Sequence, residues 1–175
     1  MIAERVGNPA QDAPDYVALG RLAFAEDDFV ATRDHWQSAF RQQRSSGNAR
    51  GAARIAADLA ALYAGVFGNE ALAAGWLARA HRLLAGTGRC VEQGYVALAF
   101  LSMHRFDLAA VENDAALALE LALEFADSDL EVLASHMVTQ LGSRQPWARA
   151  TAVVSRYTAA RLVGGRRRAN PTIRC

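Results

Sequence analysis

Lysine is absent from this sequence of 175 residues, so every one of its 19 basic residues is an arginine. Without lysine there is neither a Schiff-base nucleophile nor the lysine of a phosphate-binding loop, and the enzyme classes that depend on them are excluded. Cysteine is almost as rare, and Cys90 and Cys175 form neither a metal-binding spacing nor a disulfide framework. These absences remove several kinds of chemistry at the outset.

Proline is also scarce, with four residues, and the chain lacks the runs of β-branched and aromatic residues that are typical of strands. Alanine and leucine dominate instead, and both favour helices. The sequence therefore predicts an all-α protein. Its length suits one domain, or one domain with a tail.

No segment carries the marks of secretion or membrane insertion. Glu4 and Arg5 have no apolar stretch behind them, which argues against a secretory signal. Between Glu131 and Arg144 the chain runs for 12 residues without an acid or an arginine, which is too short to span a bilayer. We expect a cytoplasmic protein with no membrane partner.

Three segments share one plan: an apolar helix, a short polar break, and a second helix with closely spaced alanines. Helices are predicted over residues 15–25 and 29–44, over 51–67 and, after a break at 68–69, up to the closing Gly86, over 90–104 and 108–126, and once more over 129–141. The breaks at Asp27, Gly68 and Arg105 are 41 and 37 residues apart. Because such pairs cannot bury their apolar faces alone, we expect them to stack.

The stretch GNEALAAGWLARAHRLLAG (68–86) contains a tryptophan and a histidine and could be read as a site. Asn69 suits the N-cap of a helix and Gly86 suits the position after its end. His81 falls beside an apolar face, so we interpret the stretch as one helix of a scaffold. That face is formed at intervals of three and four by Ala73, Trp76, Leu77, Ala80 and Leu84, with Trp76 expected to supply most of the buried area.

The run GRLAFAEDDFVATRDHWQSAF (20–40) resembles a tetratricopeptide repeat. Gly20 stands at the small-residue position, Asp28 and Phe29 stand at the turn, and Trp36 and Ala39 lie on the second helix. The resemblance implies a tetratricopeptide-like superhelix of about three helical hairpins and a partial fourth. This domain would cover residues 13–142, after a flexible segment 1–12.

A narrower resemblance covers residues 13–135. The segment GNEALAAGWLARAHRLLAGTGRCVEQGYVAL (68–98), together with LALEFADSDLEVLA (121–134), is similar to the tetratricopeptide-like region of actinobacterial LuxR-type transcriptional regulators. In that family the array precedes a helix-turn-helix domain. Nothing after residue 141 looks like a LuxR-type recognition helix, so we expect a truncated relative without the DNA-binding domain.

The resemblance implies a non-enzymatic role in protein–protein interaction. The first helix of each pair would line a concave groove, with Arg21 and Asp58 as polar groups that face it. A truncated array would also leave its last hairpin uncovered, which favours self-association or a protein partner.

The sequence predicts no catalytic residue, no metal site and no cofactor. Its histidines have none of the metal-binding intervals that a helical motif such as HExxH requires. Glu120 and Glu124 are expected to form an exposed helical face, and GTGRC (86–90) is expected to link two helices. The four histidines are His35, His81, His104 and His136.

The charge is split along the chain, because residues 1–131 contain all 18 acids and 11 arginines whereas residues 132–175 contain eight arginines and no acid. Three interpretations of the basic segment 143–175 stay open. It contacts nucleic acid or another anionic surface, with Arg166, Arg167 and Arg168 as candidate contacts. It forms a last helix over 147–163 that caps the array. Or the reading frame has shifted near residue 142. Nucleic-acid binding through this segment is the alternative function.

Overall fold

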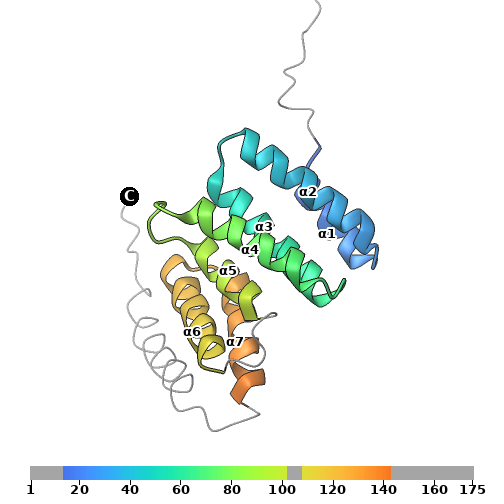
Figure 1. The fold of residues 1–175 in the computed structure, drawn as a ribbon. Helices are drawn as coiled ribbons and strands as arrows, with labels where there is room; N and C mark the ends of the chain where they lie inside the picture. Colours follow the sequence, from blue (N-terminus) through green and yellow to red (C-terminus); the bar gives the residue numbers. More distant parts are fainter. Residues whose placement is uncertain (1–13, 102–107, 143–175) are drawn as a thin grey trace, which may run out of the picture. The chain divides into compact units, whose positions relative to one another are not determined.

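The computed structural model describes residues 14–101 and 108–142, and these form seven α-helices that pack as sequential antiparallel pairs (Figure 1). The all-α prediction is confirmed, since this part of the chain contains no strand. The helices are α1 (Tyr16–Ala25), α2 (Phe29–Ser45), α3 (Ala49–Gly65), α4 (Glu70–Leu84), α5 (Val91–Leu101), α6 (Leu108–Phe125) and α7 (Ser128–Gly142).

The predicted helices correspond to the observed ones in order and number within the described ranges. The clearest difference is α3, which begins and ends two residues before its predicted bounds because Asn48 caps its first turn. The link 86–90 lies between α4 and α5, as expected. The predicted break 105–107, the segment 1–12 and the basic segment 143–175 lie outside the described residues.

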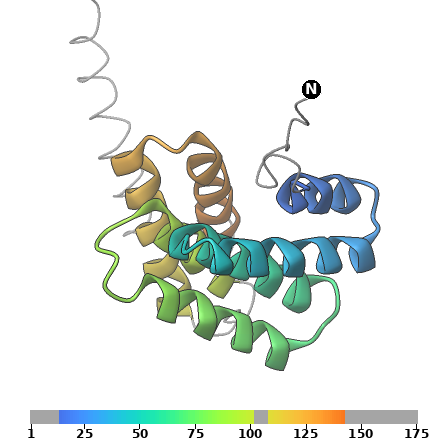
Figure 2. The same cartoon turned by 90° about the horizontal axis from the view of Figure 1, so that it is seen from above.

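Two compact units divide the chain, one ending at Gly88 and the other beginning at Arg89. In the first unit α1 packs on α2, α2 on α3 and α3 on α4. In the second, α5 packs on α6 and α6 on α7, and α7 also contacts α5. The turned view in Figure 2 shows α3 and α4 side by side, as the contacts between them require. None of the helices in the described ranges is long and apolar enough to cross a membrane.

An aspartate or asparagine begins five of the helices in the same way, and at α1 it is Asp15, which accepts from the backbone N–H of Ala18 at 3.0 Å. The side-chain oxygens of Asp28, Asn48, Asn69 and Asp127 accept backbone N–H bonds from Ala31, Gly51, Leu72 and Leu130, at distances of 2.8–3.0 Å. These bonds satisfy donors that a helix start leaves without partners. The predicted N-cap at Asn69 is thereby confirmed.

Three of the same residues also close the helix before them. The backbone N–H groups of Asp28, Asn48 and Asp127 donate to carbonyls five residues earlier, at 2.9–3.0 Å, which is the bond of a Schellman turn. Such a turn needs a left-handed residue just before its closing position. That residue is Asp27 (φ 59°), Gly47 (φ 76°) or Ala126 (φ 55°). One short sequence element thus ends a helix and starts the next.

The second helix of each pair buries a small, a large and a small side chain at positions i, i+4 and i+7. All nine are at most 2% exposed except Trp36, which is half-buried, and equivalent positions lie 41 or 42 residues apart. This spacing is more regular than that of the breaks. The nine residues are Thr32, Trp36 and Ala39 in α2, Ala73, Leu77 and Ala80 in α4, and Ala115, Leu119 and Ala122 in α6.

Gly20 makes room for the large residue of the first pair. A Cβ atom at Gly20 would lie 2.2 Å from Cδ1 of Trp36, so no larger residue fits while the indole keeps its place. Phe24 stacks on that indole, with ring centroids 6.0 Å apart. In the second unit Gly94 is in the same situation, because its Cβ would lie 2.6 Å from Cδ2 of Leu130. The two glycines therefore allow close helix packing.

Candidate functional site

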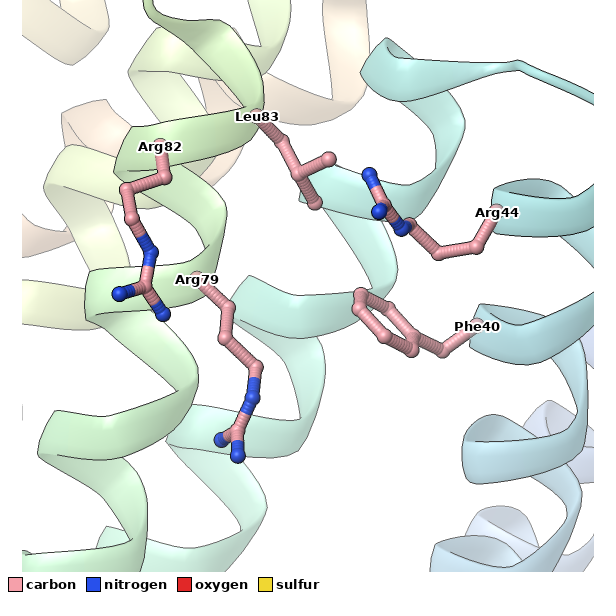
Figure 3. A pocket seen from close by; sticks show the side chains of 5 residues that line it. All are labelled: Phe40, Arg44, Arg79, Arg82 and Leu83. Atoms are coloured by element: carbon pink, nitrogen blue, oxygen red, sulfur yellow. The ribbon is translucent and has the colours of Figure 1, made fainter.

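An open pocket of about 360 Å³ lies between the C-terminal halves of α2 and α4. Figure 3 shows Phe40 and Arg44 of α2 on one side and Arg79, Arg82 and Leu83 of α4 on the other. Phe40 and Arg44 are four positions apart, and Arg82 and Leu83 follow Arg79 by three and four positions, so each set lies on one side of its helix. The pocket belongs entirely to the first unit.

Trp76 of α4 contacts two of the residues that line this pocket. Its ring meets Phe40 edge to face, with centroids 5.0 Å apart, and the guanidinium of Arg79 covers the ring at 4.8 Å. Both contacts are favourable for an electron-rich indole. Trp76 is half-buried and Leu77 is 1% exposed, and the expectation that Trp76 supplies most of the buried area of α4 stays a prediction. The indole lies at the edge of the core because it bridges to α2.

Positive charge surrounds the pocket without compensation. Arg44, Arg79 and Arg82 are exposed and form no ion pair within the described residues, and the residues that line the pocket include no acid. Among the six other arginines of the described ranges, three have acidic partners: Arg33 pairs with Asp34, Arg54 with Asp58, and Arg89 with Glu120 and Glu124. The pocket thus combines an apolar floor with guanidinium groups that can bind an anion.

The two residues predicted to face a groove lie on the first helices of their pairs. Arg21 is exposed on α1, and Asp58 is half-buried on α3, where its carboxylate accepts from Arg54 Nε at 3.5 Å. Burial raises the pKa of Asp58 above its usual value, and the charges of Arg54 and Arg21 offset only part of that rise. Arg21 and Asp58 are therefore close enough to interact electrostatically.

Among the described residues, the histidines do not gather into a site. His81 is exposed on α4, and the ring of His35 stacks on Tyr16 with centroids 6.3 Å apart. Across the part of the chain that the structure describes, no group of three or more histidine, cysteine or acidic side chains is placed to hold a metal ion. His104, Arg166, Arg167 and Arg168 lie outside the described residues.

Glu120 and Glu124 are exposed on α6, as predicted, but they also bind Arg89. The hydrogen bond from Arg89 to Glu124 raises the pKa of that guanidinium above its usual value. Two glutamates four residues apart lie on the same face of a helix, so both can form an ion pair with one cation. Glu120 and Glu124 therefore form an ion-pair cluster with Arg89 within the second unit.

Sequence reasoning missed the pocket because its residues come from helices of two different pairs. A local signal was present, since Arg41 and Arg44 on α2 and Arg79 and Arg82 on α4 each stand three residues apart. That spacing places each pair on one helical face. Which helical faces meet depends on how the helices pack, and the packing cannot be predicted from any single segment of the sequence.

No protein-family model matches the chain, and no curated protein matches it. The similarity of residues 68–98 and 121–134 to LuxR-type regulators therefore stays a prediction from those residues.

Proposed function

We propose that this chain is a non-enzymatic helical-repeat module that acts by binding another protein on the face formed by α2 and α4. The observation that carries the proposal is the pocket between these helices, where Phe40 and Leu83 form an apolar floor under three arginines. Exposed apolar and aromatic groups beside arginine are enriched where proteins bind one another. The proposal therefore follows from the chemistry of this surface.

The composition of the pocket argues for binding rather than catalysis. Arginine stays protonated at all physiological pH values, so it can hold an anion but cannot serve as a general base. The remaining side chains, Phe40 and Leu83, carry no reactive group. The surface can select a ligand by charge and shape, and it offers no group that would take or give a proton.

We propose further that the pairs stack as a tetratricopeptide-like superhelix, related to the regulatory segment of LuxR-type regulators. Support comes from the small–large–small residues that recur at 41 or 42 positions and from the packing of Gly20 against Trp36. The contact of α2 with α3 also joins one pair to the next within the first unit. Repeat proteins bury their cores through contacts between neighbouring pairs.

Affinity capture with the full chain tests the proposed binding face. The double variant Arg44→Gln/Arg82→Gln removes two arginines of the pocket but keeps Arg79 on Trp76, so that contact is preserved. We expect partner proteins held by the wild type to be recovered at about one tenth of that level with the variant, because each lost charge-assisted contact weakens binding. Quantitative mass spectrometry of extracts from the source organism measures the recovery.

Arg33→Gln/Arg50→Gln is the control, because it removes the same charge from half-buried Arg33 of α2 and exposed Arg50 of α3, neither of which lines the pocket. It should retain the same proteins as the wild type. Equal recovery by both double variants would overturn the proposed face. Loss with Arg21→Gln alone would instead assign binding to the groove that the repeat resemblance implies.

The alternative function, nucleic-acid binding through residues 143–175, depends on the eight arginines and absent acids of the C-terminal 44 residues. It predicts DNA affinity that falls steeply with salt and is lost when residues 143–175 are deleted. The two functions therefore differ in the segment that matters. Deleting residues 143–175 removes none of the residues that line the pocket.

A further inference from the structure

We infer that the pocket between α2 and α4 binds an acidic segment of a partner protein, with an apolar side chain of that segment seated between flanking carboxylates. The inference rests on the proposed function and names the ligand of the same face. It is argued from the charge around the pocket, the surface of its floor, its size, and the charge balance of the first unit.

The arrangement of charge selects a carboxylate-rich ligand. Arg79 and Arg82 stand on α4 and Arg44 faces them from α2 (Figure 3). A guanidinium offers a planar fork of N–H donors that matches the two oxygens of a carboxylate. Carboxylates on both sides of a bound segment can therefore each meet an arginine of one helix.

The floor of the pocket adds an apolar requirement. Phe40 and Leu83 are both half-buried, so part of each side chain faces the opening and part packs on the protein. Phe40 is fixed by its edge-to-face contact with Trp76. A volume of about 360 Å³ holds one or two side chains, and because the pocket is open it suits a segment lying across it.

The first unit as a whole favours a short acidic segment over nucleic acid. Residues 14–88 contain eight arginines and seven acids, so this unit is almost neutral as a whole and is not a broadly basic surface. Nucleic-acid binding draws on many phosphate contacts over an extended basic surface. The ring of Trp76 is also covered by Arg79, which occupies a face on which a base would stack.

Fluorescence anisotropy with the full chain and labelled synthetic peptides tests the inference. The probe acetyl-DEDLFDED-amide contains both the acidic residues and the apolar residues that we expect the pocket to bind. A peptide with its Leu-Phe pair replaced by Ser-Gly keeps the acids alone, and acetyl-NQNLFNQN-amide keeps the apolar pair alone. We expect the first peptide to bind about tenfold more tightly than either of the others, because both parts of the pocket contribute.

Variants of the pocket locate the binding. Arg44→Gln/Arg82→Gln should weaken binding of the complete peptide about tenfold, whereas Arg33→Gln/Arg50→Gln leaves it unchanged. Arg44→Lys/Arg82→Lys keeps the charge but loses the fork, so an intermediate affinity is expected. Circular dichroism checks that each variant is as helical as the wild type. Equal affinity of all three peptides, or of all variants, overturns the inference.

Two further outcomes separate this inference from the proposed function. If the peptides fail to bind while captured proteins are still lost with Arg44→Gln/Arg82→Gln, the face is right and the ligand class is wrong. If a labelled single-stranded oligonucleotide binds the wild type more tightly than the acidic peptide and is released by the same variant, the pocket recognises phosphate. Either result overturns the acidic segment as the ligand.

Discussion

At the scale of single residues, the turns between helices depend on left-handed backbone positions. Gly47 and Gly68 occupy two of them, with φ of 76° and 62°, and a Cβ added at either would meet no atom within 4 Å. Asp27 and Ala126 occupy two more without the freedom of glycine. Residues other than glycine rarely adopt this backbone conformation because their Cβ then crowds the neighbouring carbonyl oxygen. At Gly47 and Gly68 the choice of residue is therefore restricted by the backbone conformation and not by contacts of a side chain.

Gly65 and Gly68 allow a paired test of that restriction. Gly65 is the last residue of α3 and has open space around it, so Gly65→Ala should raise the free energy of unfolding by about 0.5 kcal/mol. Gly68→Ala should lower it by about 1 kcal/mol because its φ is positive. Urea denaturation followed by circular dichroism measures both. Effects of the same sign would show that the turn at Gly68 is not left-handed.

At the scale of helices, the contact between α1 and α2 depends on one glycine and one indole. Gly20 and Trp36 fit together, whereas α4 and α6 carry Leu77 and Leu119 at the position of the indole. Different large residues can occupy this position when the facing residue matches them, since cores tolerate changes that conserve volume. The repeated element is therefore the small–large–small spacing rather than a particular side chain.

A double-mutant cycle tests this complementarity. Gly20→Ala should destabilise the protein by about 1–3 kcal/mol, because its Cβ would overlap a ring on which Phe24 stacks. In a Trp36→Leu background, Gly20→Ala should lower the free energy of unfolding much less. The interaction free energy between the two positions should therefore be about 1 kcal/mol or more. Gly75→Ala is the control, since its Cβ would make ordinary contact with Arg79. Additive effects at positions 20 and 36 would contradict the packing.

Much of this helical layout could be predicted from the sequence, because its signals are local. Glycine and asparagine at 47–48 and at 68–69 identify turns by their backbone preferences. The left-handed conformation of Ala126 could not be read in this way, since alanine gives no local preference for it. There the next residue decides, because Asp127 closes one helix and caps another.

At the scale of the whole molecule, the candidate site was beyond sequence reasoning. The repeat resemblance directed attention to the first helices, where Arg21 and Asp58 lie, whereas the pocket is formed by second helices of two neighbouring pairs. Such a surface exists only after the pairs have packed. The helices could be predicted from intervals of three and four, but the contact of α4 with α2 joins Trp76 to Phe40, which is more than thirty positions away.

The central claim is that the chain binds another protein on the face formed by α2 and α4. Hydrogen–deuterium exchange of the full chain, with and without saturating acetyl-DEDLFDED-amide or a captured partner, tests it most directly. We expect slower exchange on binding in the C-terminal halves of α2 and α4, with α1 and residues 143–175 unchanged. Protection confined to α1 and α3, or to residues 143–175, would contradict the claim.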